Sequence, residues 1–446
     1  MYDVVGVGFG PSNLALAIAL EEQPLLNLRE RSSALFFERQ PTFGWHRHML
    51  LPSATMQVVF LKDLATFRNP VSPFSFVSFL HASDRLAKFS NKQSFFPTRR
   101  EFHQYLEWAA SSFTDRVFYE SEVCEVRLPS NAESGPAEHL EVLVRTPHGR
   151  RQVSARNIVV STGLVPRMPR GAERGKTVWH SSEFLAQFQR ADPQQLTRVG
   201  VVGAGQSAAE ITRFLHTALP HATVYSIIPA YGYSIADDTP FANQIFDPIA
   251  VDDYYFGTAR TREAFWQYHK NTNYSVVDDE VIDDLFRLSY EESLSDSVRL
   301  NFLNLTRVLG VEHDGAGTRV RLLSLQDGGS RDLDVDALVC ATGYDAMDPS
   351  SLLGDLDRYC LRDQFGQYQV ERDYRVATTP DLACGIYLQG GTEHTHGLSA
   401  SLLSNIAVRS GEIAQSVTDR RGEGGLRSRE AASEFAGPGP EAKLMP

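Results

Sequence analysis

Two glycine turns, each placed between a short apolar segment and a helix-like segment, constrain the fold of this chain more than any other feature. The first ends an apolar run at Gly8 and precedes a helical pattern that begins at Pro11. The second follows the apolar residues 199–202 and precedes a longer helical run. A glycine turn between strand and helix lets backbone amides approach a phosphate at the helix N-terminus. The pair therefore predicts two dinucleotide-binding folds.

The first turn has the spacing Gly8-x-Gly10-x-x-Asn13, and its helix starts with Pro11. Gly8 permits the tight turn, and Gly10 lets backbone amides approach a pyrophosphate where the helix dipole favours negative charge. Asn13 replaces the glycine that normally allows close packing of helix on strand. Glu38 ends the next apolar strand and takes the place of the acidic residue that holds a ribose. We expect these residues to bind one dinucleotide.

The second turn has the spacing Gly203-x-Gly205-x-x-Ala208, with strand and helix signals on both sides. Gln206 and Ser207 directly follow the turn, where their polar groups can reach a phosphate. Two such turns in one chain are much more specific than either alone. We expect this second turn to bind a second dinucleotide.

Two apolar strands that end in Thr-Gly, at 157–163 and 337–343, each mark a strand that leaves a nucleotide-binding fold. The second fold is therefore predicted to be inserted in the first, in an α/β architecture with two Rossmann-like domains. The tail is rich in Gly, Pro, Glu and Ser and carries few large apolar residues, which predicts disorder. The predicted boundaries are 1–165 and 335–418 for the first domain, 166–334 for the second, about 235–298 within it for a mostly helical substrate subdomain, and 419–446 for the disordered tail.

Composition limits the partners of the chain. A net charge of −12 argues against nucleic acid, because its binders concentrate Lys and Arg to displace counterions. No apolar stretch approaches the ~20 residues needed to span a bilayer, and no basic segment precedes the first apolar run. We therefore expect a cytoplasmic protein without membrane or nucleic-acid partners.

Histidine and cysteine patterns give no metal site. The pairs His46/His48 and His394/His396 have no cysteine or carboxylate at matching spacing. The four cysteines form no C-x-x-C pair, which excludes a zinc knuckle and a dithiol redox centre. We expect no metal.

Long ungapped strings spread over about residues 3 to 415 are similar to one known family. They are FGWH (43–46), MLLP (49–52), MQVVFLKDL (56–64), RNP (68–70), FPTR (96–99), DTPFAN (238–243), NTNY (271–274), ATGY (341–344) and HTHGLS (394–399). The chain resembles the bacterial L-ornithine N5-monooxygenases of the lysine N6-hydroxylase and L-ornithine N5-oxygenase family. These are N-hydroxylating flavoprotein monooxygenases of siderophore biosynthesis.

The resemblance implies a reaction and two cofactors, FAD and NADPH. In that family NADPH reduces FAD, oxygen adds to the flavin C4a, and the neutral substrate amine attacks the distal oxygen of the C4a-hydroperoxyflavin. The implied activity converts L-ornithine to N5-hydroxy-L-ornithine for a siderophore or a related natural product. No catalytic side chain is implied, because the flavin carries the chemistry. The resemblance also implies a homo-oligomer, a tetramer in many members.

Four residues are implied to bind the substrate. Lys62 corresponds to the lysine that pairs with the substrate carboxylate, and its apolar neighbours mean that a buried Lys62 needs a counter-charge. Asn243 and Asn273 match amide contacts to the substrate backbone. Ser399 matches a contact on the side shared by substrate and flavin.

The resemblance adds further cofactor contacts to the residues of the two glycine turns. Those implied for FAD are Gly8, Gly10, Pro11, Asn13, Glu38, Trp45, His46, Gln57, Val123, His396, Gly397, Leu398 and Ser399. Those implied for NADPH are Gly203, Gly205, Gln206, Ser207, Asn273, Tyr274 and Ser275.

One departure and two alternatives stay open. Many family members carry an arginine just after the strand at 223–228, suited to the ribose 2′-phosphate, and this chain has Pro229 there. The sequence therefore favours NADPH over NADH and leaves the strictness of that preference open. One methylene in a pocket is worth only ~1–3 kcal/mol, so L-lysine or a diamine is the alternative substrate. A non-catalytic flavin-binding redox sensor is the alternative of another class, disfavoured because Lys62 and Asn243 are both present.

Overall fold

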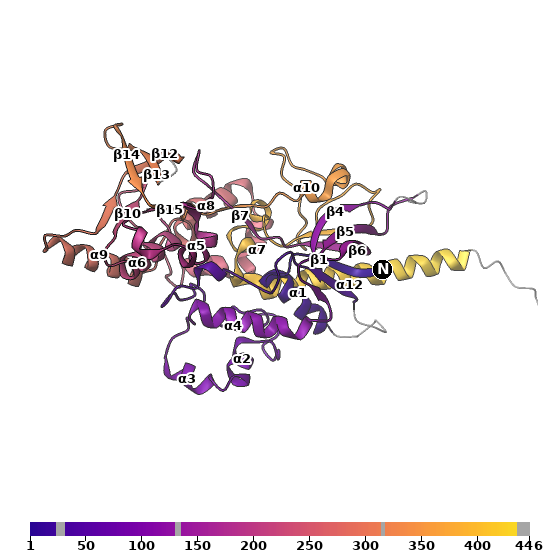
Figure 1. The fold of residues 1–446 in the computed structure, drawn as a ribbon. Helices are drawn as coiled ribbons and strands as arrows, with labels where there is room; N and C mark the ends of the chain where they lie inside the picture. The colour runs from indigo at the N-terminus through magenta and orange to yellow at the C-terminus, as the bar shows by residue number, and fades with distance from the viewer. Residues whose placement is uncertain (24–31, 130–134, 314–316, 435–446) are drawn as a thin grey trace, which may run out of the picture.

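The computed structural model of the protein describes residues 1–23, 32–129, 135–313 and 317–434, with all their side chains except those of Lys270 and residues 421–434. Two groups of strands lie towards opposite ends of the molecule, as Figure 1 shows. One group surrounds β4 to β6, and the other surrounds β10, β15 and β12 to β14. Helix α7 and strand β7 lie between the two groups (Figure 1).

The first sheet has the order β3-β2-β1-β6-β5-β4, and β17 also pairs with β6. Strand β1 lies between β2 and β6, and all three run parallel. The long strand β6 pairs antiparallel with β5 in its first half and parallel with β1 and β17 in its second half. The strands are β1 (Tyr2–Val7), β2 (Ala34–Phe37), β3 (Val117–Phe118), β4 (Glu122–Arg127), β5 (Leu140–Thr146), β6 (Gly149–Val160) and β17 (Gly385–Leu388).

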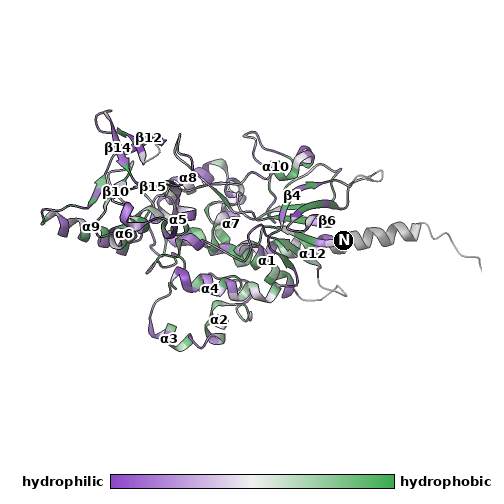
Figure 2. Cartoon of the chain, viewed as in Figure 1, coloured by the Kyte–Doolittle hydropathy of each residue, from purple (hydrophilic) through white to green (hydrophobic). Residues whose placement is uncertain are grey.

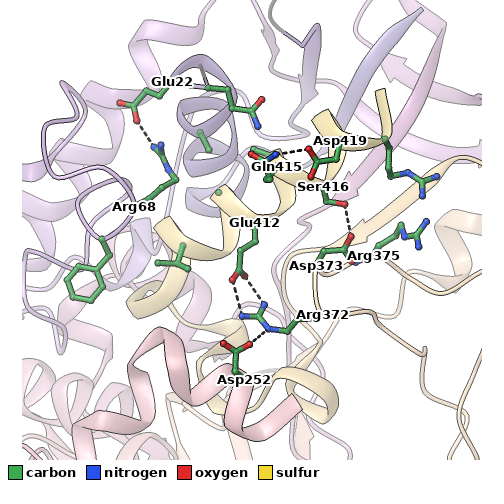
Figure 3. Close-up of a pocket in the computed structure, with 17 residues that line it drawn as sticks. Glu22, Arg68, Asp252, Arg372, Asp373, Arg375, Glu412, Gln415, Ser416 and Asp419 are labelled. Carbon is green, nitrogen blue, oxygen red and sulfur yellow. Dashed lines mark hydrogen bonds and ion pairs between the residues drawn. The ribbon is translucent and has the colours of Figure 1, made fainter. Parts of the chain in front are cut away.

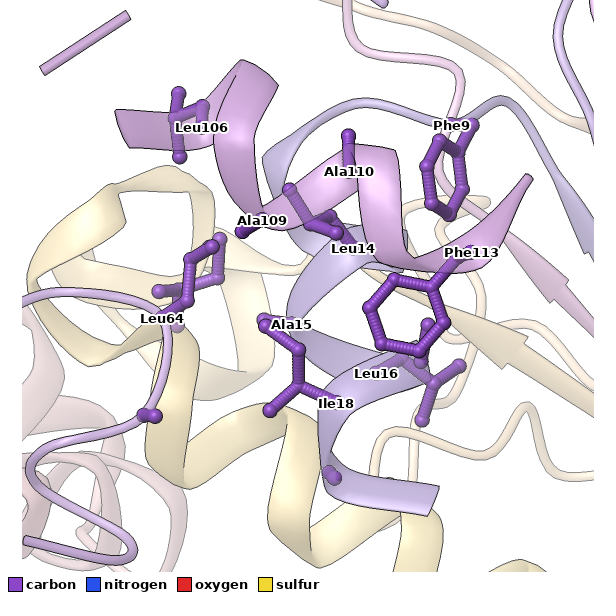
Figure 4. Packing of buried hydrophobic residues seen from close by; sticks show 14 of the residues in the cluster. Phe9, Leu14, Ala15, Leu16, Ile18, Leu64, Leu106, Ala109, Ala110 and Phe113 are labelled. Carbon is purple, nitrogen blue, oxygen red and sulfur yellow. The ribbon is translucent and has the colours of Figure 1, made fainter. Parts of the chain in front are cut away.

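Helix α1 (Pro11–Glu21) is apolar on nearly every side because it is covered from several directions. It packs against α12 (Ile406–Glu434) and α4 (Arg99–Ala110) on one face of the first sheet. Figure 4 shows Leu14 and Ala15 of α1 close to Ala109 and Ala110 of α4, with Phe113 beside them. A second apolar cluster fills the opposite face of the sheet. The glycine turn before α1 is therefore held between two cores.

The second sheet is wholly parallel, with the order β11-β10-β9-β15-β8. Its strands are β8 (Val178–His180), β9 (Arg198–Val202), β10 (Thr223–Ile227), β11 (Leu300–Leu303) and β15 (Ala337–Cys340). Helix α6 (Gln206–Ala218) follows β9 through the second glycine turn. The predicted start of the returning first domain at residue 335 was wrong, because β15 pairs with β9 and β8 and so completes the second sheet.

The chain crosses between the two sheets through a short antiparallel ribbon. Strand β7 (Leu164–Pro166) pairs with β16 (Tyr344–Ala346), so the outgoing and returning segments lie side by side. The side chain of Arg167 donates through Nε to Asp345 Oδ1 at 2.8 Å across this ribbon. A separate antiparallel sheet is inserted between β11 and β15 of the second fold, formed by β12 (Thr306–His313), β13 (Thr318–Ser324) and β14 (Ser330–Val335).

The segment predicted as a helical subdomain contains α7 (Pro248–Tyr255), α8 (Ala259–Asn273) and α9 (Asp279–Ser293). These helices have different neighbours. Helix α9 packs on α6 of the second fold, whereas α7 packs on α11 (Glu393–His396) of the first. The helical segment therefore links the two folds.

The tail departs from its prediction. Helix α12 is described from Ile406–Glu434, although disorder was predicted from residue 419. The stretch 419–434 contains Gly422, Gly424 and Gly425, which disfavour a helix, but its other residues are mostly Arg, Glu, Ala and Leu, and extending an existing helix avoids the cost of a new nucleus. The rest of the predicted tail, 435–446, lies outside the described residues.

Amphipathic helices complete the cover of the sheets. In Figure 2, α4, α6 and α9 show both hydrophilic and hydrophobic colours, whereas the strands near β4 and β6 are mostly hydrophobic. Such helices bury one apolar stripe and leave the other face in water. The remaining α-helices are α2 (Phe76–Ala82), α3 (Leu86–Asn91), α5 (Phe184–Arg190) and α10 (Ser350–Leu353). A search of the described helices finds none long and apolar enough to cross a membrane.

Candidate active site

The first glycine turn has the geometry of a phosphate cradle. Gly8 has φ +82°, and a Cβ added there would lie 2.5 Å from the backbone oxygen of Ser161. Any side chain at this position would separate the ends of β1 and β6. A Cβ added at Gly10 meets no atom within 4 Å, so the space before the N-terminus of α1 is open. These features fit the pyrophosphate of a dinucleotide.

Asn13 and Glu38 support the turn from behind and beside it. Asn13 is fully buried; its Nδ2 donates to Gly8 O at 2.7 Å, and its Oδ1 accepts from Gln389 Nε2 at 3.2 Å. Glu38 at the end of β2 accepts from the backbone N–H of Phe9 at 2.8 Å through Oε2. Asn13 is therefore placed to brace the backbone of the turn, and Glu38 stands at the strand end predicted for a ribose.

The predicted flavin-side residues before α2 form an aromatic wall. Trp45 lies with its ring centroid 6.0 Å from that of Phe102 and 4.6 Å from that of His46. Burial, followed by the charges of Arg99 and His103, lowers the pKa of His46 to about 4. His46 is therefore neutral at physiological pH.

The residues around α11 form a second wall. His396 stacks on Tyr374 with ring centroids 4.1 Å apart, and burial lowers its pKa to about 3. Gly397 has φ +75°, and a Cβ there would lie 3.1 Å from the ring of Tyr254 on α7. Leu398 is buried in the 3₁₀ turn η7 (Leu398–Ser401) that follows. This wall brings the helical segment against the first fold.

The second glycine turn is tighter than the first. Gly203 has φ +145°, and an added Cβ would lie 2.3 Å from the backbone oxygen of Ala341 at the end of β15. Gly205 begins α6 in an extended conformation, with its would-be Cβ 3.7 Å from the Cα of Ser275. The predicted nicotinamide-side segment at Ser275 therefore lies directly over the turn.

Gln57 and Gln206, predicted for different cofactors, meet on one carboxylate. Gln57 Nε2 donates to Asp278 Oδ1 at 3.0 Å, and Gln206 Nε2 donates to Asp278 Oδ2 at 2.9 Å. The backbone N–H of Asp278 donates to Gln206 Oε1 at 2.8 Å. Burial raises the pKa of Asp278, and the Gln57 hydrogen bond opposes that shift. The two predicted cofactor sites are thus joined through a residue that sequence reasoning missed.

A buried ion pair runs beside this junction. Arg99 of α4 donates through Nη1 and Nη2 to the two carboxylate oxygens of Glu210 on α6, both at 2.8 Å. Glu210 is 3% exposed and also accepts from Gln206 Nε2 at 2.9 Å. In the sequence, Arg99 at the end of the FPTR string is a signal for this ion pair. Its partner Glu210 lies 111 residues away, so the pairing itself was not predicted.

The predicted substrate residues converge on one short turn. Lys62 is half-buried, with its Nζ 5.7 Å from the ring centroid of Phe246 in the 3₁₀ turn η5 (Ala242–Phe246). Burial lowers the pKa of Lys62, and nearby Asp247 opposes this shift. Asn243 lies in the same turn, and its Nδ2 donates to Asp238 O at 2.6 Å.

The other two substrate residues reach this turn through their elements. Turn η5 packs on η7, which contains the buried Ser399, and on α8, which ends at Asn273. Tyr274 follows Asn273, and its hydroxyl donates to Glu393 Oε1 at 2.7 Å. Elements distant in sequence thus bring Lys62, Asn243, Asn273 and Ser399 into one region between the two folds.

Two predicted residues, Ser207 and Val123, and the departure at Pro229 are placed without a distinctive side-chain contact. Ser207 is half-buried at the second position of α6. Val123 lies in β4, opposite Val144 at a register shift. Pro229, the departure noted after β10, follows Ile228, whose backbone N–H donates to Leu303 O at 3.0 Å.

Comparisons with known proteins agree with this geometry. Residues 1–346 match the model of the L-lysine 6-monooxygenase/L-ornithine 5-monooxygenase family. The L-ornithine N(5)-monooxygenase of Pseudomonas aeruginosa is 37% identical over 426 residues, covering 94% of each chain. The chain belongs to this family. Both the recognition from sequence strings and the monooxygenase class are therefore confirmed.

Solved structures of this monooxygenase family are also similar. The ornithine N-hydroxylase KtzI of Kutzneria sp. 744, with reduced FAD, NADP⁺ and L-ornithine, is 59% identical over 94% of this chain and all of its own, with a TM-score of 0.91. The L-lysine 6-monooxygenase of Pseudomonas syringae is 32% identical over the same shares, with a TM-score of 0.81. A thioredoxin reductase of Lactococcus lactis, 11% identical with a TM-score of 0.54, shares the fold alone. The predicted architecture of two Rossmann-like folds is confirmed.

One cavity of this monooxygenase is lined by residues other than the converging ones. It has a volume of about 1010 Å³ and lies between α1, α7 and α12 (Figure 3). Figure 3 shows Arg372 between Asp252 and Glu412, with Nε 2.6 Å from Asp252 and Nη1 2.9 Å from Glu412. Arg372 is thus paired with two carboxylates, whereas Asp373 and Asp419 accept hydrogen bonds from Ser416 and Gln415. Over the described part of the chain, no three His, Cys, Asp or Glu side chains are grouped to hold a metal ion.

Proposed function

We propose that this chain is an L-ornithine N5-monooxygenase that converts L-ornithine to N5-hydroxy-L-ornithine for siderophore or related natural-product biosynthesis. FAD and NADPH are its cofactors, in agreement with the two glycine turns and with the FAD and NADP⁺ of the KtzI structure. The flavin, reduced by NADPH and supplied with oxygen, carries the oxidation. The protein must position the substrate, separate it from water and keep both nucleotides in place.

The observation that carries this proposal is the position of Lys62. Its half-buried ammonium group lies beside Phe246, on the turn that also carries Asn243. It forms no ion pair within the part of the chain described here. A partly desolvated cation without a pairing carboxylate suits the carboxylate of an amino-acid substrate. We assign Lys62 to that carboxylate, and Asn243, Asn273 and Ser399 to the rest of the substrate.

The cofactor roles follow from the geometry of the two turns. We assign FAD to the first turn together with the walls around Trp45 and His396, and NADPH to the second turn together with Tyr274 and Ser275. His46 and His396 are neutral near pH 7, so each presents a ring without adding positive charge. We retain the cofactor contacts predicted for four further residues, which are FAD for Pro11, Gln57 and Val123 and NADPH for Ser207.

The domain limits, assembly and location belong to the same proposal. We place the FAD-binding domain at 1–165 and 344–418 and the NADPH-binding domain at 166–343, because β15 completes the second sheet. Within the second domain, the helical segment at about 235–298 forms the substrate subdomain. Homo-oligomeric assembly and a cytoplasmic location are kept from the sequence as proposals.

A product assay tests the substrate. Purified protein with FAD, NADPH and oxygen is supplied with L-ornithine, L-lysine or a short diamine, and products are identified by mass spectrometry. The expected result is a mass increase of one oxygen on ornithine, with NADPH consumption matched by hydroxylamine. Hydroxylated lysine or diamine with unreacted ornithine would overturn the substrate assignment. NADPH consumption that yields only peroxide with every amine would show an uncoupled NADPH oxidase, and no NADPH consumption with any amine would favour a non-catalytic flavoprotein.

A further inference from the structure

Arg409 of α12 is a buried arginine without a carboxylate partner among the described residues. It is 2% exposed, and its Nε has no hydrogen-bond partner. Its Nη1 donates to the backbone oxygen of Ala400 in η7, and its Nη2 donates to Ser12 Oγ at 3.3 Å. Glu412, one turn later, is held by Arg372 through both carboxylate oxygens at 2.9 Å. A buried guanidinium ion in this state is costly unless another anion balances it.

Ser12 joins this arginine to the first glycine turn. It is half-buried at the second position of α1, next to Pro11 and two residues after Gly10. Its backbone oxygen accepts from Gln389 Nε2 at 3.3 Å and from Ser410 Oγ at 3.4 Å, which fixes its position. Because its hydroxyl oxygen accepts from a guanidinium group, its own proton is left to donate elsewhere. The open space before the helix is where a phosphate oxygen would accept it.

We propose that Ser12 and Arg409 form a relay that binds the pyrophosphate of FAD. Arg409 holds and polarises the Ser12 hydroxyl, and Ser12 donates its proton to a phosphate oxygen. Arg409 is buried even without a bound nucleotide, so it acts through Ser12 and through its charge rather than by contact. Arg409 is therefore a positioning residue. The proposal rests on the FAD assignment and is independent of the substrate.

A double-mutant cycle on FAD affinity tests the relay. Ser12→Ala, Arg409→Gln and the double variant are stripped of FAD as full chains, and the Kd for added FAD is measured by flavin fluorescence. Each single change is expected to weaken FAD binding about tenfold or more, as for the loss of a hydrogen bond to a charged group. The double variant should bind no more weakly than Arg409→Gln, because both changes remove one relay. Additive effects, or an unchanged Kd in either single variant, would overturn the proposal.

The stability of the apoprotein separates this role from a structural one. If Arg409 only held α12 to its neighbours, Arg409→Gln would lower the apoprotein Tm and leave the Kd for FAD unchanged. The relay predicts an apoprotein Tm that is unchanged or higher, because an unpaired buried charge is removed, and a smaller rise of Tm with FAD. Arg409→Lys keeps the charge and should recover part of the affinity. If Arg409→Gln fails to fold, the FAD constants of Ser12→Ala and Arg409→Lys still decide.

Arg68→Gln is the matched control. Arg68 also contacts α12, since a Cβ at Gly411 would meet its Cδ at 2.6 Å, but its Nη2 pairs with Glu22 at 2.6 Å. The control should lower the Tm of the apoprotein and leave the Kd for FAD unchanged. A loss of FAD affinity equal to that of Arg409→Gln would show that any disturbance of α12 has this effect, and would overturn the relay.

Discussion

Lys62 forms no ion pair with the described residues, although Asp247 lies nearby, so its removal should act on the substrate. Lys62→Ala is expected to raise the KM for ornithine about tenfold or more, because the substrate carboxylate loses its partner. FAD content should stay at the wild-type level, since the glycine turn is untouched. Steady-state kinetics and the flavin-to-protein ratio measure the two effects. Lys92→Ala is the control, because Lys92 also lies over a ring, that of Phe89 at 6.0 Å, and donates to Phe96 O at 2.8 Å. An unchanged KM would remove Lys62 from the site.

The same residue predicts a pH dependence. Burial lowers the pKa of Lys62 below the ordinary lysine value of 10.5, so its positive charge is lost at a lower pH than usual. The KM for ornithine should therefore rise as the pH rises through that lowered pKa. Lys62→Arg should shift the rise to higher pH, because a guanidinium group stays protonated. Ornithine ionises identically with both enzymes, so the difference between their KM profiles reports residue 62. Coincident profiles would contradict the prediction.

His396 couples stability to pH. Burial lowers its pKa from 6.5 to about 3, so between these values the unfolded chain binds a proton that the folded chain does not. The free energy of unfolding should therefore fall as the pH falls, with His396 contributing at most about 1.4 kcal/mol per pH unit. Denaturant unfolding of wild type and His396→Gln between pH 6 and 4 measures this slope. The variant should show the shallower slope, and equal slopes would show that His396 does not carry the effect.

At the scale of elements, the two glycines of the first turn should respond differently. Gly8→Ala is expected to destabilise the apoprotein by at least about 1–3 kcal/mol, the cost of a strained backbone, because φ is +82° and Ser161 O is in the way. Gly10→Ala should leave the apoprotein as stable as wild type, because its Cβ enters open space. That Cβ would instead occupy room needed by the pyrophosphate and weaken FAD binding. Thermal unfolding of the apoproteins and FAD titration separate the two effects; similar losses of stability would contradict the assignment.

Local signals explain which elements the sequence predicts well. Each glycine turn, its strand and its helix lie within a short stretch of chain, so both folds follow from periodicity and glycine placement. Periodicity and glycine placement do not show which fold contains β15, because its Thr-Gly end resembles that of β6. The pairing of β15 with β9 assigns it to the second fold. The sequence does not predict how far α12 extends, for another reason. Its composition indicated low burial, whereas helix propensity and the preceding helical turns determine whether the backbone continues as a helix.

The candidate site also has features that the sequence predicts and features that it does not. The strings containing Lys62 and Asn243 name the substrate residues through family resemblance, but nothing local shows that η5 lies against η7 and α8. In the sequence, Gln206 is simply the first residue of a helix that follows a glycine turn. Its hydrogen bond to Asp278 joins it to a residue 72 positions later, which no local pattern indicates. Polar pairs between residues distant in sequence produce no periodic pattern. Sequence reasoning can therefore identify one residue of such a pair without identifying the residue that it contacts.

At the scale of the whole molecule, the two nucleotide folds are joined by a polar junction rather than by the covalent ribbon alone. Gln57 and Arg99 come from the first fold, and Gln206, Glu210 and Asp278 come from the second. Their hydrogen bonds form a continuous chain from Arg99 through Glu210 and Gln206 to Asp278 and Gln57. This junction holds the helix after the second glycine turn, predicted for NADPH, against residues of the first fold.

The Arg99–Glu210 pair is the part of the junction with the clearest energetic signature. Its side chains are 12% and 3% exposed, so Glu210→Leu leaves a buried guanidinium without its partner and should cost about 3–5 kcal/mol of stability. Arg99→Met combined with Glu210→Leu should regain most of that loss, because no unpaired charge remains. The double variant should nevertheless reduce its flavin with NADPH more slowly than wild type while keeping its FAD, since the junction loses its buried Arg99–Glu210 link and keeps only the bonds of Gln57 and Gln206 to Asp278.

The exposed pair Arg167–Asp345 on the ribbon is the matched control, because it also joins the two crossings but is 57% exposed on both sides. Arg167→Gln should cost less than about 1 kcal/mol and leave the rate of flavin reduction unchanged. Denaturant unfolding and stopped-flow reduction by NADPH measure the two quantities for every variant. A double variant that is stable and reduces its flavin at the wild-type rate would limit the buried pair to a structural role. Slow reduction in a stable protein would instead show that the relative placement of the two folds sets the rate of hydride transfer.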